Sequence, residues 1–104
     1  GASDEHVFAL WYGAYVSSPE HGIVPIAGPM LDYDWYWQVL VANHPDVVPA
    51  LDTIKQGESR LVQLVNHNLV DRSVQLTYVD PSLEKIFNLK KNGDLWQVSE
   101  TLVK

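Results

Sequence analysis

Apolar and polar residues alternate through the last third of the chain, and this pattern predicts three antiparallel strands. The alternating runs are Val74–Val79, Leu83–Lys90 and Leu95–Val103. Asp80-Pro81-Ser82 separates the first two runs, and Asn92-Gly93 separates the last two. Asn-Gly between alternating runs is a strong hairpin signal, because a type I′ turn needs a positive φ at both central residues. We therefore expect a C-terminal meander in which each strand pairs with the next.

The register of this meander follows from its two turns. If Lys91 faces Asp94, apolar residues pair with apolar residues and a basic residue pairs with an acidic one, as cross-strand contacts prefer. The earlier turn places the first strand on the same apolar face, which then needs a cover from the rest of the chain. The predicted pairs are Leu89 with Trp96, Phe87 with Val98, Lys85 with Glu100, Leu83 with Leu102, Leu76 with Phe87 and Val74 with Leu89.

The first residues predict an amphipathic helix from Ser3 to about Ser17. Ser3 can serve as the N-cap, and Asp4 and Glu5 fall in the first turn, where the helix dipole favours negative charge. Apolar residues then recur at three- and four-residue steps and form one stripe, which is the expected cover of the meander. The stripe consists of Val7, Phe8, Trp11, Ala14 and Tyr15.

The middle of the chain is less regular. Proline and glycine recur in Glu20–Leu31, which predicts an ordered, extended connection. Asp32–Asn43 fits a helix that Asp32 or Asp34 caps, although its aromatic and β-branched residues also fit a strand. Its acidic start favours the helix. Asp46–Gln56 predicts a short helix with Pro49 in its first turn and with Val47, Leu51 and Ile54 facing inward.

Ser59–Asn66 fits either a strand or a continuation of the preceding helix. Gly57 and the Asn66-His67-Asn68 cluster are breaker signals, and they favour a separate strand. Taken together, the elements predict one α+β domain over residues 1–104. In it, one or more N-terminal helices pack on a curved antiparallel sheet that ends in the C-terminal meander.

This arrangement resembles that of the small exported NTF2-like domains, many of which belong to families of unknown function. The resemblance covers the first helix and Ser59–Val103, and its most legible element is the Asn-Gly-Asp-Leu-Trp-Gln-Val segment at 92–98. It implies an NTF2-like or cystatin-like roll, in which a curved sheet wraps a helix to form a cone that can hold a ligand. NTF2-like enzymes carry an Asp/His pair in the cone. No pair here matches that pattern, so no functional residue is carried over.

Composition and charge narrow the class of partner. With 46% hydrophobic and 19% charged residues, the chain has the composition of a globular domain. Seven basic and thirteen acidic residues give a net charge of −6, which argues against nucleic acid as a partner, because phosphate backbones require clustered lysine and arginine. No apolar run is long enough for a membrane span. A cationic partner fits this charge, and the oligomeric state stays open.

The chain has no cysteine, which excludes disulfides, thiolate metal sites and a cysteine nucleophile. Ala2-Ser3-Asp4 resembles the start of an exported protein after a small-residue cleavage site. We therefore expect a periplasmic or secreted protein, with an arbitrary start of the chain as the alternative.

Catalytic and cofactor motifs are missing from the sequence. The histidines, His6, His21, His44 and His67, show no metal-binding spacing, so no metal site is predicted. No Walker, Rossmann or nucleophile-elbow glycine pattern occurs, so no cofactor and no catalytic residue are assigned. Asp32 and Asp34 can form a general acid/base pair, but capping of a helix explains them better.

Aromatic density is the unusual feature of the composition. Tyr33 and Trp37 point away from the predicted inner face of the 32–43 helix, and Asp34 and His44 are the polar residues assigned beside them. Such a mixture of apolar walls and few polar groups is typical of binding clefts. We expect Glu20–Leu31 to form the rim of this site. The cluster consists of Trp11, Tyr12, Tyr15, Tyr33, Trp35, Tyr36 and Trp37.

Three classes of function fit these features. The first is a non-catalytic exported domain that binds a small ligand or a protein partner through an aromatic-lined cleft. The second is an acidic inhibitor or immunity-type protein that blocks a cationic enzyme. The third is a small cone-fold enzyme that uses Asp34 or Asp32 with His44.

Overall fold

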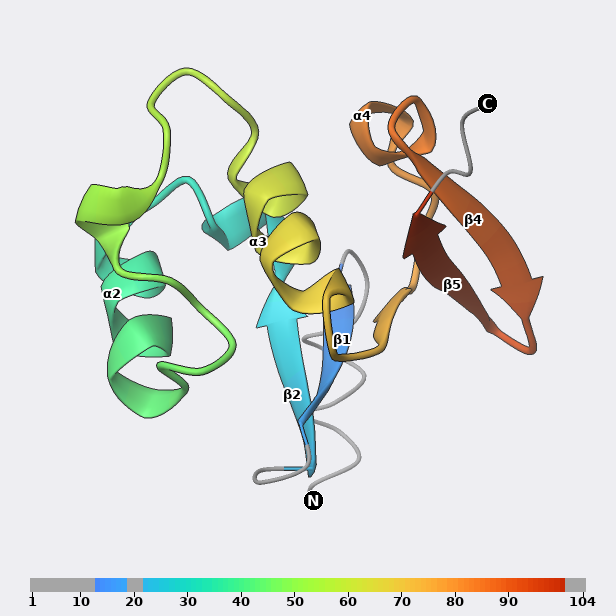
Figure 1. Cartoon of the computed structure of the whole chain (residues 1–104), viewed down its shortest axis with the longest axis horizontal. Helices are drawn as coiled ribbons and strands as arrows, with labels where there is room; N and C mark the ends of the chain where they lie inside the picture. Colours follow the sequence, from blue (N-terminus) through green and yellow to red (C-terminus); the bar gives the residue numbers. More distant parts are fainter. Residues whose placement is uncertain (1–12, 19–21, 101–104) are drawn as a thin grey trace.

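Figure 1 presents the computed structural model, which describes residues 13–18 and 22–100. These residues form a five-stranded antiparallel sheet with strand order β2-β1-β3-β5-β4. The α+β class is therefore confirmed. No helix in this part of the chain is long and apolar enough to cross a membrane. The strands are β1 (Gly13–Ser18), β2 (Gly22–Ala27), β3 (Val74–Leu76), β4 (Phe87–Asn92) and β5 (Leu95–Glu100). The helices are α2 (Asp34–Asn43), α3 (Arg60–Leu69) and the short α4 (Pro81–Glu84), with 3₁₀ turns η1 (Gly28–Met30) and η2 (Leu51–Thr53).

One hydrophobic core joins the sheet to α2 and α3. Alternate residues of the strands are buried, as the two-residue period of a strand requires. They form one cluster with the inner residues of the two helices. The largest fully buried members are Trp37, Ile26, Leu31, Leu64, Leu76 and Leu83.

The N-terminal half of the sheet corrects two predictions. Residues 13–18 form a strand, so the helix expected from Ser3 to Ser17 is wrong over its last five residues, and its earlier part lies outside the described residues. Glu20–Leu31 was expected to be an ordered, extended connection, but it contains a strand of the sheet, β2, and the 3₁₀ turn η1. Tyr15 pairs with Pro25. Proline is tolerated there because β2 is an edge strand, whose outer donors need no partner within the sheet.

The C-terminal meander is also wrong, because β5 lies between β3 and β4. Asp80 and Pro81 begin the helix α4 instead of a tight turn: proline suits the first helical turn, and the Asp80 carboxylate accepts a bond from Ser82 N at 2.8 Å. This helix carries the chain past the position that β5 later fills. As a result β3 pairs with β5, matching Val74 with Val98 and Leu76 with Trp96, instead of pairing with β4.

The β4–β5 hairpin is present, with its register shifted by two residues from the prediction. Asn92 pairs with Leu95, and Leu89 pairs with Val98, so the turn residues are Gly93 and Asp94. Gly93 has φ +66°, and no non-glycine residue in the described ranges has a positive φ. A positive φ at the first central position alone fits a type II′ turn. A shift of two residues keeps each side chain on its predicted face, so Val98 stays in the core.

The middle of the chain contains two regular helices. The helical interpretation of Asp32–Asn43 is confirmed, although Tyr33 is the N-cap and makes no side-chain capping bond. The strand expected at Ser59–Asn66 is wrong, because these residues belong to α3 and its cap. Ser59 Oγ accepts from Val62 N at 3.2 Å, and this bond starts the helix.

Asp46–Gln56 does not form the expected short helix. It contains turns and the 3₁₀ turn η2. Val47 and Ile54 are nevertheless buried, as predicted. The backbone N–H groups of Val47 and Val48 both bond to the carbonyl oxygen of His44, which shapes a tight turn directly after α2.

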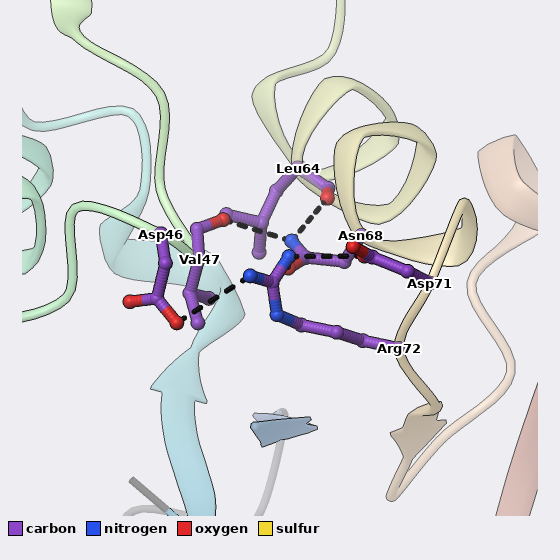
Figure 2. A network of polar contacts seen from close by, with 6 residues as sticks. All are labelled: Asp46, Val47, Leu64, Asn68, Asp71 and Arg72. Atoms are coloured by element: carbon purple, nitrogen blue, oxygen red, sulfur yellow. Dashed lines mark hydrogen bonds and ion pairs between the residues drawn. The ribbon is translucent and has the colours of Figure 1, made fainter. Parts of the chain in front are cut away.

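A buried polar network fastens this turn to the end of α3 (Figure 2). The Asn68 amide donates to the carbonyl oxygens of Val47, at 2.9 Å, and of Leu64, at 2.7 Å. The Arg72 guanidinium lies 3.4 Å from the Asp46 carboxylate. Asn68 is fully buried, so its amide satisfies a carbonyl group that water cannot reach. The network therefore joins the turn that follows α2 to the end of α3.

Candidate functional site

The outer side of α2 exposes three large side chains that are mainly apolar. Tyr33 and Trp35 are each 57% exposed, and Val39 is 48% exposed. The ring centroids of Tyr33 and Trp35 are 6.3 Å apart, while Trp35 and Val39 are four residues apart on the helix and therefore lie on one side. We call Tyr33, Trp35 and Val39 the aromatic face. Figure 1 shows α2 at one end of the molecule, with β4 and β5 at the other.

Trp37 does not belong to this face, and its predicted outward orientation is wrong. Its side chain is fully buried, and its Nε1 donates to the carbonyl oxygen of Pro49 at 2.9 Å. The Arg60 guanidinium carbon lies 5.9 Å from the centre of its ring. Because a helix turns by about 100° per residue, Trp35 and Trp37 point in nearly opposite directions. The tryptophan that the helix presents to solvent is therefore Trp35.

A shallow groove of about 620 Å³ continues the outer side of α2. Gln38 and Ala42, one residue before and three after Val39, line it from the helix. Its other wall comes from residues 50–56, which carry η2. The groove is mainly apolar and has one acidic residue, Asp52. Its lining is Gln38, Val41, Ala42, Ala50, Leu51, Asp52 and Gln56.

Asp34 and His44 lie at opposite ends of α2. Asp34 is in the first turn, and its carboxylate is 2.8 Å from Nη2 of Arg60 on α3. His44 follows the last helical residue and donates its backbone N–H to Leu40 O. Ten helical residues span about 15 Å, so the structure does not bring this carboxylate and this imidazole together. Asp34 instead helps to hold α2 against α3.

Arg60 is the centre of the contacts between the two helices. Besides its ion pair with Asp34, it donates from Nη1 to Leu31 O at 3.1 Å. Its side chain is only 13% exposed, whereas that of Asp34 is 65% exposed. The guanidinium is therefore largely committed to contacts within the chain. This role could not be predicted from the sequence, because the ion pair joins residues 26 positions apart.

A second pocket, of about 380 Å³, opens where α2 and α3 begin. Gly28, Pro29 and Leu31 line this pocket, and they belong to the segment that was predicted as the rim of the aromatic site, but Tyr33 and Trp37 do not line it. Its polar residues come from three separate segments. They are Asp32, Ser59, Arg60, Tyr78 and Asp80. We call this cavity the acidic pocket.

Tyr78 is neutral at physiological pH. Burial raises the pKa of its hydroxyl to about 12, and the negative charge of Asp80 and a hydrogen bond with Asp80 act in the same direction. The pocket charges that remain are therefore the Asp32 and Asp80 carboxylates and the Arg60 guanidinium. No three metal-ligating side chains gather in the described part of the chain, so these carboxylates do not form a metal site there.

Comparisons with protein families, with curated proteins and with solved structures found no match to this chain. Its function is therefore inferred from its own residues. The candidate site predicted from the sequence lies on the same helix, but it included Trp37 and did not include Trp35 and Val39, which are the exposed residues. A helical wheel that places Trp37 in the core would have found both, because they then fall on the solvent side.

Proposed function

We propose that this protein is a non-catalytic binding domain that holds a protein partner on the aromatic face of α2. The observation that carries this proposal is the exposure of Tyr33, the N-cap of α2, together with Trp35 and Val39 on the helix itself. Scattered apolar residues on a surface need no explanation, but a contiguous group with two aromatic rings is typical of an interaction site. Tryptophan and tyrosine are also the residues that most often dominate binding energy at interfaces.

The shape of this surface supports a protein or peptide over a small ligand. The aromatic face is the convex side of a helix, and the neighbouring groove is shallow. Small ligands bind in concave sites that enclose most of their surface. An apolar side chain of a partner can enter the groove beside Ala42, while other partner residues cover Trp35. The first class of function allowed either a small ligand or a protein as the binding partner, and the shape of this surface favours the protein.

Charge supports a partner with basic groups near its apolar contacts. Asp32, Asp34 and Asp52 lie around the aromatic face and the groove, and α2 itself contains no basic residue. Opposite charges at the edge of an interface mainly raise the association rate and the specificity. An inhibitor of a cationic enzyme also needs acidic residues around its contact surface. The acidic surroundings of the aromatic face therefore favour a cationic enzyme as the protein partner.

Two other sequence-based expectations stay predictions. Export is one, and it rests on Ala2-Ser3-Asp4 alone. The resemblance to NTF2-like domains is the other, and what supports it is an antiparallel sheet whose core is shared with α2 and α3. The enzymatic alternative receives no support from the positions of Asp34 and His44.

A peptide selection tests the proposal without a known partner. The domain is immobilised, a displayed library of random peptides is passed over it, and the enriched peptides are synthesised and titrated by fluorescence anisotropy. We expect enrichment of peptides that contain aromatic or aliphatic residues and bind with micromolar affinity. Val39→Ala should weaken this binding several-fold, because Val39 lies at the centre of the proposed contact.

Val70→Ala is the matched control. Val70 is 81% exposed and follows α3, so the same side-chain truncation is made away from the aromatic face. The control should leave the affinity unchanged. The proposal fails if no peptide is enriched, or if Val39→Ala and Val70→Ala affect binding equally.

A further inference from the structure

The acidic pocket adjoins the aromatic face through consecutive residues. Asp32 lines the pocket, Tyr33 belongs to the aromatic face, and Asp34 binds the pocket residue Arg60. A segment that covers Tyr33 and Trp35 therefore passes the mouth of the pocket.

The charges in and beside this pocket do not cancel. Asp32 and Asp80 line it and Asp34 lies beside it, and among the residues that the structure describes the only guanidinium that lines the pocket is that of Arg60. Arg60 is already bonded to Asp34 at 2.8 Å and to Leu31 O at 3.1 Å. The remaining negative charge belongs to Asp32 and Asp80. A positively charged group is what this pocket attracts.

The walls fit a cation that is carried on an alkyl stem. Pro29, Leu31 and Leu61 provide apolar surface, and the carboxylates and the Tyr78 hydroxyl provide polar surface. Lysine and arginine have this form, because an apolar alkyl chain carries their charged group. The alkyl chain can contact the apolar walls while the charged group contacts the carboxylates. The Asp80 carboxylate accepts bonds from Ser82 and also bonds Tyr78. Because a carboxylate has about four acceptor positions, it keeps capacity for such a cationic group.

We infer that the partner of the aromatic face inserts a lysine or arginine side chain into the acidic pocket, with its apolar residues over Trp35 and Val39. This inference rests on the proposed function and adds the chemistry of the partner. The partner segment is amphipathic. Its basic residue lies next to the start of α2, and its apolar residues lie toward the groove. The basic residue sets the direction in which the segment lies along the helix.

A double-mutant cycle tests the inference. The highest-affinity peptide from the selection is titrated into the wild-type protein and into Asp32→Asn and Asp80→Asn. The peptide is then remade with its basic residue replaced by a neutral analogue, norleucine for lysine or citrulline for arginine. Asp80→Asn preserves the start of α4, because asparagine also caps helices well.

We expect each asparagine variant to weaken binding of the basic peptide by about two- to fivefold, as loss of a partly exposed ion pair predicts. The same variants should not weaken binding of the neutral peptide further, because the charge they lack then has no partner. The loss should shrink as salt is added, since salt screens such pairs. Asp94→Asn, at the β4–β5 turn, is the control and should change nothing.

The results separate this inference from the proposal beneath it. If the selected peptides lack basic residues, or if Asp32→Asn and Asp80→Asn change the affinities of the basic and neutral peptides equally, the inference is wrong. In either case a loss of binding in Val39→Ala still supports the aromatic face. If no peptide is enriched, both fail. Comparing a lysine peptide with its arginine counterpart identifies which cation the pocket prefers.

Discussion

The helices α2 and α3 have ten residues each and pack into the same core, but their outer sides differ. α3 buries Leu61, Leu64 and Val65, and it turns the polar Asn66 and His67 toward solvent. It therefore has one apolar side, which faces the core, and one polar side. α2 also has a buried side, which carries Trp37 and Leu40. Its solvent side, however, carries further large apolar residues.

This difference indicates which residues serve the fold and which require another reason. A surface helix usually has one apolar stripe, and that stripe faces the core. Apolar side chains that stay about half exposed gain only part of the burial energy, and they increase the tendency to associate. Folding therefore does not account for Trp35 and Val39. The two tryptophans of α2, two residues apart, separate the two roles.

The largest expected effect comes from the buried tryptophan. Trp37→Ala should reduce the free energy of unfolding by about 3–5 kcal/mol, because it leaves a cavity in the core and removes the bond to Pro49 O. Trp35→Ala should change it by no more than about 0.5 kcal/mol. Urea denaturation followed by circular dichroism measures both. Equal losses would erase the distinction between the two sides of α2.

A smaller effect is expected from the buried amide of α3. Asn68→Ala should cost about 1–3 kcal/mol, because the carbonyl oxygen of Val47 loses its partner inside the protein. Asn43→Ala is the matched change on α2, where the last residue is exposed, and it should cost less than about 0.5 kcal/mol. Chemical denaturation of the two variants compares them directly. A larger loss in Asn43→Ala would contradict the structural role assigned to the network in Figure 2.

The smallest effect on stability is expected from the exposed valines. Val39→Ala and Val70→Ala should each shift the free energy of unfolding by less than about 0.5 kcal/mol, because both side chains are largely exposed. Thermal unfolding of the two variants checks this. A distinct loss in Val39→Ala alone would mean that the aromatic face contributes to packing, and the binding interpretation would lose its main support.

The sequence predicted where the C-terminal strands lie better than it predicted which strands pair with each other. The hairpin at residues 87–100 was located correctly, because its signal is local. The insertion of β5 between β3 and β4 was missed, since that pairing depends on the path of the chain through α4. The strand expected at Ser59–Asn66 was wrong because Gly57 and Asn66 were interpreted as breakers, while the cap at Ser59 determines the start of a helix.

Only some residues of the candidate site could be predicted from the sequence, and the physical reason is related. A helix that is apolar on both sides has no sequence phase that shows which side is buried. Contacts of Trp37 with Pro49 and Arg60 decide this, and both are distant in sequence. Tyr33 was correctly expected at the surface. Trp37 was expected there as well, but the exposed tryptophan is Trp35. The acidic pocket depends on Tyr78 and Asp80, whose approach to Asp32 only the tertiary fold creates.

The binding role of α2 is tested most directly by isothermal titration calorimetry, which measures the affinity of the selected peptide for the wild-type protein and for Trp35→Ala. We predict that Trp35→Ala weakens binding by about thirtyfold, the effect of losing a central aromatic contact, while its melting temperature stays that of the wild type. An unchanged affinity would contradict the account. So would a loss of affinity that is matched by an equal loss of stability, because Trp35 would then be part of the fold.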